Sequence, residues 1–281
     1  MRYRQLPSYC KPCLEGLARQ AMSLACGPEE ENLRLALDWL EELYHPELPP
    51  PVIASRLHRR IKSYCANEDP YAPLKKKEME IARRMAEKLL PAYEGDIKGL
   101  LLFSLLGNTL DFFRPPEEAE AAFKKGLKLA FDQSDEVTEK IKRACSVLLL
   151  TDNAGEVFFD LPLLRFLKEA GLRVFYAVKP KPIQNDLSLK DLKELGLDLP
   201  AEVISTGAEM VGLSLSEASP EFKKIYFGTE VVLAKGMGHF ETLSSSPGRE
   251  VAFLLCAKCV PVARALKVEI NDYVIFISNA K

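Results

Sequence analysis

The chain has 281 residues, which is enough for one large domain or two modest ones with a substantial buried core. Its 38 basic and 40 acidic residues nearly cancel, so the charge gives no reason to expect nucleic acid or an anionic membrane as a partner. No apolar run is long enough to span a bilayer, and the N-terminus lacks the apolar core of a signal peptide. We therefore expect a cytoplasmic protein.

The first half of the chain predicts helices. Apolar side chains recur there at intervals of three and four residues, which is the period of an amphipathic helix. Glycine and proline interrupt this pattern at Gly27–Pro28, Pro49–Pro51, Asp69–Pro70 and Pro115–Pro116. The expected helices cover residues 14–25, 31–44, 51–64, 75–93, 96–113 and 117–144, the last with a break near 132–135. We predict an all-helical domain over residues 1–145 that covers the site.

From Ser146 onward, short β-branched or aliphatic runs alternate with helical segments. This alternation predicts right-handed crossovers and a mainly parallel sheet. The run Val147–Leu150 has no polar alternate face, as expected for a strand covered on both sides. The expected strands cover residues 146–150, 173–178, 202–205, 231–234, 251–255 and 273–277, with helices over 156–170, 188–195, 220–224 and 261–266. We predict an α/β domain over residues 146–281 with a doubly wound sheet, whose final strand is a candidate for an antiparallel edge position.

Polar side chains follow several of these strands. In open parallel sheets, ligands bind beyond the carboxyl ends of the strands. Asp152–Asn153 follow the first expected strand, Asn185–Asp186 follow the second, and Lys235–Gly236 end the fourth. Carboxylate and amide oxygens suit Mg²⁺ or Mn²⁺, and a lysine can bind a phosphoryl oxygen as a point charge. The pattern predicts a divalent metal held by Asp152, Asn153 and Asp186, with Lys235 on the phosphate.

The expected reaction is hydrolysis of a phosphate ester by a metal-bound water. A phosphatase that forms a phospho-aspartate needs a second acid two residues after the first, and this chain has Ala154 there. The chain also lacks the glycine-rich loops of nucleotide-binding proteins. Taken alone, Asp152–Asn153 could simply be a turn and a helix cap.

Four of the seven cysteines form two C-x-x-C pairs, Cys10/Cys13 and Cys256/Cys259. The odd total argues against a secreted disulfide framework. Together the pairs could form a structural metal site, or they could be disulfides or buried thiols. The sequence does not show whether the two pairs meet.

These segments, in this order, resemble the family once labelled domain of unknown function 89, now linked to damage-control phosphatases, and most of all its short microbial branch. The pieces that carry the resemblance are Cys10–Leu14, Gly107–Phe112, Thr151–Glu156 with Asp160, Pro182–Asp186, Val232–Glu241 and Leu255–Cys259. Most members of the family carry Asn where this chain has His239, a departure that bears on substrate choice.

The resemblance implies a metal-dependent phosphatase that acts on small phosphorylated metabolites such as sugar or nucleotide phosphates. The metal would be Mg, Mn, Co or Ni, bound by Asp152, Asn153 and Asp186. The resemblance also implies that Lys235 binds the phosphate and that Asn108, Glu156 and Asn185 line the pocket. Further candidates for substrate binding are Asp111, which shares a helix face with Asn108, and Gly236, His239 and Glu241 in the segment after Lys235.

Two alternatives stay open. One is an S-adenosylmethionine-dependent carboxyl methyltransferase, an activity suggested for a distant branch of the family. The absence of a glycine-rich loop after the first strand counts against it. The other is a non-catalytic metabolite-binding protein. The sequence indicates neither the physiological substrate nor the oligomeric state.

Overall fold

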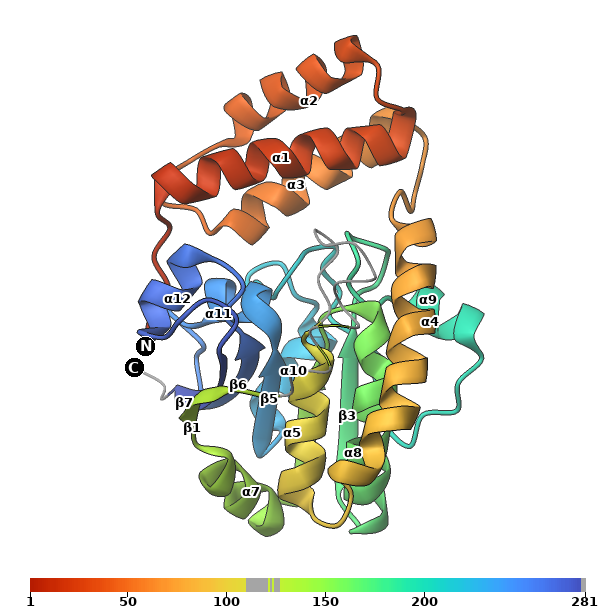
Figure 1. Cartoon of the computed structure of the whole chain (residues 1–281), viewed down its shortest axis with the longest axis vertical. Coiled ribbons are helices and arrows are strands. Elements are labelled where there is room, and N and C mark those ends of the chain that lie inside the picture. The colour runs from red at the N-terminus through yellow and green to blue at the C-terminus, as the bar shows by residue number, and fades with distance from the viewer. Residues whose placement is uncertain (110–120, 122, 124–126, 279–281) are drawn as a thin grey trace.

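The computed structural model describes residues 1–109, 121, 123 and 127–278 (Figure 1). Asp111 lies outside the described residues, as do parts of the two helices expected over 96–113 and 117–144. No helix in the described part of the chain is long and apolar enough to cross a bilayer.

A seven-stranded sheet forms the centre of the molecule, with the strand order β1-β7-β6-β5-β2-β3-β4. Strands β2 to β6 pair with one another in parallel, whereas β7 is antiparallel to β6 and parallel to β1. All six expected strands are present, with bounds that agree within one residue. The strands are β1 (Leu129–Asp132), β2 (Ser146–Leu150), β3 (Arg173–Val178), β4 (Glu202–Ser205), β5 (Val231–Lys235), β6 (Val251–Cys256) and β7 (Tyr273–Ser278).

Strand β1 was not expected, because the segment that contains it was predicted to be helical. Its residues pair with β7, and the side chain of Gln133 directly after it accepts a hydrogen bond from the Ile277 N–H at 2.8 Å. A four-residue strand is too short to show a clear alternation, so its pairing with a distant segment decides its conformation. Because β1 lies outside β7, the last strand is antiparallel as expected but does not form the edge. The division of the chain after residue 145 stays a prediction.

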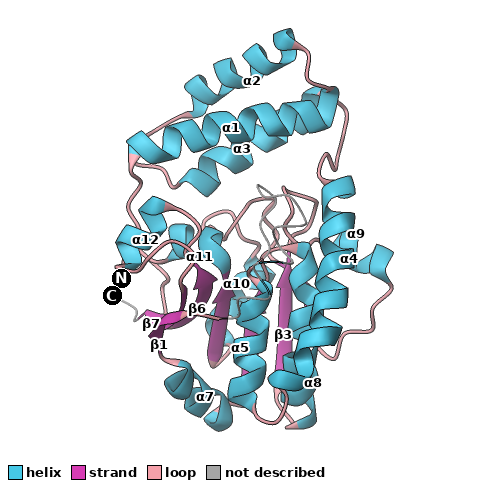
Figure 2. Ribbon diagram, viewed as in Figure 1, coloured by secondary structure: helices cyan, strands magenta, loops and turns pink. Residues whose placement is uncertain are grey.

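Helices cover both faces of the sheet, so the predicted doubly wound α/β fold is confirmed (Figure 2). Alternate strand residues point to opposite faces: Val147 and Leu149 pack toward one helix layer, and Leu148 and Leu150 toward the other. The first layer contains α5 (Ile97–Gly107), α7 (Ser134–Arg143), α8 (Val157–Glu169) and α9 (Leu189–Leu195). The second contains α10 (Pro220–Gly228), α11 (Gly236–Leu243) and α12 (Val260–Leu266).

Helix α4 (Ala72–Leu89) packs against α8 and against the short 3₁₀ turn η2 (Ala154–Glu156) that follows β2. A buried ion triad holds it: Lys75 Nζ lies 3.0 Å from Asp69 and 2.7 Å from Asp191, which caps α9. A buried charge that lost its partners would be costly, so these pairs hold α4 beside the loop after β3.

The first three helices, α1 (Pro7–Cys26), α2 (Glu30–Leu43) and α3 (Pro50–Tyr64), form a small bundle with its own core. Figure 1 shows this bundle at the end of the molecule toward which β3 points. Helix α3 is tied to the loops after β3 and β4, because Lys62 Nζ binds the Glu209 carboxylate at 2.5 Å and the Pro182 carbonyl at 2.6 Å. The bundle therefore covers the edge of the sheet where the expected site residues lie.

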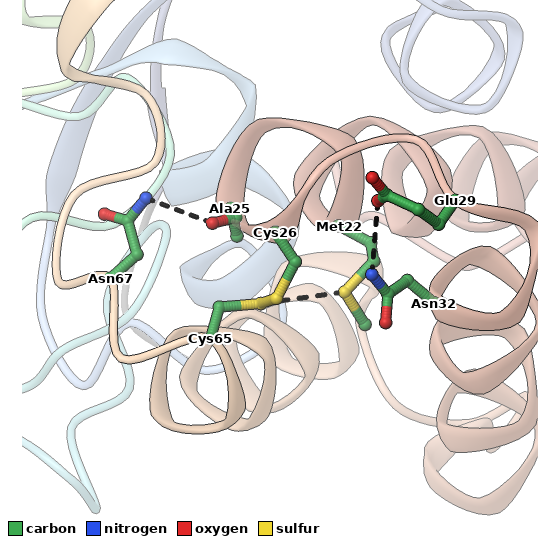
Figure 3. Close-up of a disulfide and its surroundings, with 7 residues drawn as sticks. All are labelled: Met22, Ala25, Cys26, Glu29, Asn32, Cys65 and Asn67. Atoms are coloured by element: carbon green, nitrogen blue, oxygen red, sulfur yellow. Dashed lines mark hydrogen bonds between the residues drawn. A yellow bond between two sulfur atoms is a disulfide. The ribbon is translucent and has the colours of Figure 1, made fainter.

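A disulfide joins Cys26 at the end of α1 to Cys65 directly after α3, with 5.4 Å between the Cα atoms (Figure 3). Met22 Sδ lies 3.8 Å from Cys65 Sγ, and the Asn67 side chain donates to the Ala25 carbonyl at 3.4 Å. The sequence pointed only to the two C-x-x-C pairs as possible disulfides, and in the described structure none of those four cysteines forms one.

We expect the disulfide to stabilise the bundle. It closes a loop of 39 residues, for which the chain-entropy relation gives about 4 kcal/mol. Reduction, or replacement of both Cys26 and Cys65 by Ser, should lower the midpoint of thermal unfolding. Cys145→Ser, at an exposed free thiol, serves as the control. A midpoint that is the same with and without reductant would contradict the stabilising role.

Candidate functional site

Main-chain hydrogen bonds hold the loops after β2 and β3 side by side. The Leu187 N–H donates to the Asp152 carbonyl at 2.8 Å, and the Ala154 N–H donates to the Asn185 carbonyl at 2.8 Å. Asn153 and Asp186 form an isolated β-bridge between the two loops. The structure thus brings Asp152, Asn153 and Asp186 together, and all three line one cavity.

The two carboxylates of this cluster lie in a buried and acidic environment. Burial raises the pKa of Asp152 well above its usual value, and the nearby Glu156 and Asp186 raise it further. Burial also raises the pKa of Asp186, to about 6, although Lys179 Nζ lies 3.4 Å from its Oδ2 atom. The charged forms of both carboxylates are therefore destabilised unless a cation lies beside them.

The cluster has the donor atoms that a divalent cation needs. Asp152 and Asp186 offer hard oxygens, and within the described part of the chain Asp186 Oδ2 has only the ion pair with Lys179. A cation between the carboxylates would relieve their repulsion. No group of three His, Cys, Asp or Glu residues has the arrangement of a metal site among the described residues. The predicted ligand set has only two carboxylates, and the third ligand is the Asn153 amide. All three provide oxygen donors, which is the kind of ligand that a divalent cation of this class prefers.

Two asparagines position the cluster. Asn108, at the end of α5, donates to Asp152 at 3.0 Å and to Glu156 at 2.7 Å, and it accepts from the Cys256 N–H at 3.0 Å. Asn185 donates to Asn153 Oδ1 at 2.7 Å. Asn185 lines the cavity as expected, whereas Asn108 lies behind the carboxylates.

Lys235 is not where the sequence analysis expected it. It is fully buried and does not line the cavity, and its Nζ atom lies 2.5 Å from Asp160 and 2.6 Å from Glu156. Burial opposes its charge, but the two carboxylates outweigh this effect and raise the pKa of Lys235. Ser104 and Tyr176 also donate to Asp160, at 2.6 and 2.8 Å. Lys235 and Glu156 therefore lie in a buried ion-pair cluster beneath the acidic residues, and neither of them lines the cavity.

His239 is also turned away from the cavity. Its Nδ1 atom lies 2.7 Å from the Lys235 carbonyl, and burial lowers the pKa of the ring to about 3. An imidazole with this pKa is neutral near pH 7, and because the ring is fully buried it does not line the cavity as the predicted substrate-binding role requires.

The lysine that does line the cavity is Lys258, which directly follows β6 in the Cys256–Cys259 segment. Its charge lowers the pKa of Asp152, which places the two side chains close enough to interact. The sequence places this segment at the end of the fifth expected strand, but no role was predicted for Lys258. The signal was available, because Lys258 follows a parallel strand at the same edge of the sheet as Asp152.

Gly236 allows β5 and α11 to approach the cluster. Its φ angle is +79°, and a Cβ atom there would lie 1.9 Å from Asp152 Oδ2. Both the backbone conformation and the space exclude a side chain. Gly236 is thus a steric requirement of the site.

The cysteine pairs separate in space. Cys10, Cys13 and Cys259 line the same cavity as the acidic cluster, whereas Cys256 is packed in the core on the face covered by α5. This separation arises because Cys256 ends β6 and Cys259 begins the connection to α12, on the other face. A structural metal or disulfide cluster of all four cysteines does not fit this arrangement.

Glu241 lines the cavity, on α11. Burial raises the pKa of its carboxyl to about 7, and Tyr3 partly offsets this effect through a hydrogen bond. Glu241 is therefore a weakly acidic part of the cavity wall.

The α/β fold of this chain is shared with a known protein family. Residues 7–274 match the damage-control phosphatase ARMT1-like domain, and the chain belongs to this family. A damage-control phosphatase of Pyrococcus horikoshii is 35% identical over 267 residues, covering 92% of this chain and 93% of that protein. A damage-control phosphatase of Archaeoglobus fulgidus is 31% identical over 277 residues, covering 94% and 96%. The crystal structure of a DUF89 family protein from Pyrococcus horikoshii superimposes with a TM-score of 0.85 at 33% identity, covering 96% of this chain and 98% of that one.

We expect Gly236→Ala to abolish binding of Mn²⁺ as measured by calorimetry, because the new methyl group must displace the Asp152 carboxylate. Gly228→Ala is a matched control, since a Cβ atom there has nothing within 4 Å. Normal Mn²⁺ binding by a folded Gly236→Ala protein would contradict this account of the glycine.

We expect Glu241→Gln to stabilise the fold at alkaline pH. The folded pKa of about 7 lies above the ordinary value of 4.5, so the charged carboxylate destabilises the folded state increasingly as pH rises between these values. Removing the charge should raise the free energy of unfolding by about 3 kcal/mol at pH 8 and have little effect at pH 4. Urea unfolding at both pH values measures this, with Glu169→Gln on the surface of α8 as control. Equal effects of Glu241→Gln at the two pH values would disprove the shift.

Proposed function

We propose that this chain is a metal-dependent phosphatase that releases inorganic phosphate from small phosphorylated metabolites. The observation that carries the proposal is the convergence of Asp152, Asn153, Asp186 and Lys258 on one cavity at the carboxyl edge of the sheet. Membership of the damage-control phosphatase family, and the names of its two archaeal relatives, support the same reaction.

The residues proposed to hold the metal are Asp152, Asn153 and Asp186, with Mg²⁺, Mn²⁺, Co²⁺ or Ni²⁺ as the candidates. When bound, such an ion supplies acidity to a coordinated water and neutralises charge on the phosphate. The chain holds these ligands in place before any substrate arrives, because Asn108 fixes Asp152 and Asn185 fixes Asn153.

The phosphate is proposed to bind beside this cluster, with Lys258 as its cationic partner. A lysine there offsets the negative charge of the ester and of the two aspartates. Lys179 has a different task, since its Nζ atom binds Asp186 and, at 2.6 Å, the Gly212 carbonyl.

A covalent phospho-aspartate is not part of the proposal. Such a mechanism places an acid two residues after the nucleophilic aspartate, and here that residue is Ala154, which is fully buried in the hydrophobic core. Direct attack by water does not need this acid.

Phosphate release from a panel of phosphomonoesters, with each of the four metals, tests the proposal. We expect activity that chelation removes and that Asp152→Asn reduces by at least about 100-fold, the usual effect of losing a charged group that acts on the transition state. Lys258→Met should lower kcat/KM by a similar factor without lowering the midpoint of unfolding. Lys235→Met should instead destabilise the fold, by about 3–5 kcal/mol, because it leaves Glu156 and Asp160 buried without their cation.

Asp198→Asn and Lys168→Met, both exposed, are the matched controls and should behave as the unmodified protein. Undiminished activity after Asp152→Asn and exhaustive chelation would refute the proposal. Affinity for phosphate esters without turnover would favour a metabolite-binding protein, and metal-independent binding of S-adenosylmethionine would favour a methyltransferase.

A further inference from the structure

The cavity beside the acidic cluster is much larger than a phosphate group requires. Its volume is about 460 Å³, within the range of sites that enclose whole small molecules. Asp152, Asp186 and Lys258 line it from the sheet, and α1 and α3 line it from the helical bundle. The space between the sheet and the bundle is therefore available for the organic part of a substrate.

Apolar side chains form most of the wall that this organic part would contact. They come from α1, α3, the loop after β4 and the start of α12, so four separate parts of the chain contribute to one apolar surface. The residues are Leu14, Leu17, Pro51, Ala54, Val211 and Val260.

Partners for hydroxyl groups are scarce in this wall. Apart from the cysteines, most polar side chains of the described lining belong to the loops at the sheet edge, and only three lie elsewhere, namely Tyr3, Tyr9 and Glu241. The Tyr9 hydroxyl accepts a hydrogen bond from Arg264 at 3.4 Å. The Tyr3 hydroxyl is already shared with Cys10, 3.4 Å away, and with Glu241. A sugar that entered would give up water at several hydroxyls, at a cost of about 1–3 kcal/mol for each one left without a partner. An apolar group would instead gain from leaving water.

The charge of the lining points to a single phosphate. Lys258 is the one lysine or arginine that the described lining contains, and it lies next to two aspartates. One lysine together with one divalent ion matches a monoester better than a diphosphate.

Building on the proposed phosphatase activity, we infer that the preferred substrates are phosphomonoesters whose organic part is an apolar chain or an aromatic ring, in place of a sugar. The acidic cluster and Lys258 hold the phosphate, while the bundle and α12 enclose the apolar part.

The experiment compares esters of primary alcohols, so that the leaving groups are alike and only the organic part differs. The apolar esters are n-hexyl and 3-phenylpropyl phosphate, and the polar esters are glucose 6-phosphate and glycerol 1-phosphate. With Mn²⁺ present, we expect kcat/KM to be about 10-fold to 100-fold higher for the apolar esters.

A pair of substitutions tests whether the wall causes this preference. Val211→Thr combined with Val260→Thr replaces two methyl groups by hydroxyls with almost no change of size. The ratio of kcat/KM between 3-phenylpropyl phosphate and glucose 6-phosphate should fall at least about fivefold. Val203→Thr on β4 makes the same change at a side chain that is 39% exposed, away from the cavity, and should leave the ratio unchanged.

The outcomes separate the inference from the activity on which it rests. Release of phosphate from all four esters at equal rates, or faster from the sugar ester, would overturn the inference and leave the phosphatase intact. No release from any ester with any of the four metals would overturn the proposed function itself. An apolar preference that the double threonine variant does not change would show that these walls do not determine it.

Discussion

Burial of charge at one end of the sheet is the constraint on which the rest of this structure depends. Asp152, Glu156, Asp160 and Asp186 are all buried, and an unpaired carboxylate is strongly disfavoured in such surroundings. Lys235 forms ion pairs with Glu156 and Asp160, and Lys179 forms one with Asp186. What remains is a local excess of negative charge that faces the cavity, which is the condition under which a divalent cation binds.

The same constraint explains the precision of the surrounding main chain. Gly236 has no side chain because Asp152 occupies the space, and Asn108 connects α5, the cluster and β6 through three hydrogen bonds. These contacts join segments far apart in the sequence. The site is therefore held by the packing of the α/β core and not by one flexible loop.

The helical bundle contributes a different property. Its residues supply no metal ligand in the proposed set, but α1 and α3 form the apolar wall opposite the cluster. The Cys26–Cys65 disulfide and the ion pair of Lys62 with Glu209 hold this wall in place. Under the proposed function, the chemistry at the sheet edge and the recognition of the organic part belong to separate parts of the chain.

The sequence by itself determined the fold class, the position of six strands and the location of Asp152, Asn153, Asn185 and Asp186 at one edge. It could do so because strand and helix periodicities are local, and because parallel strands place their carboxyl ends together. It did not reveal β1, whose conformation depends on pairing with β7, more than a hundred residues away. Nor did it distinguish Lys235 from Lys258, because one ends a strand and the other follows one. The packing of η2 and α8 covers Lys235 with Glu156 and Asp160, while Lys258 reaches the cavity. Only the tertiary structure, in which side-chain direction and burial are settled by contacts between distant segments, decided which lysine faces the cavity.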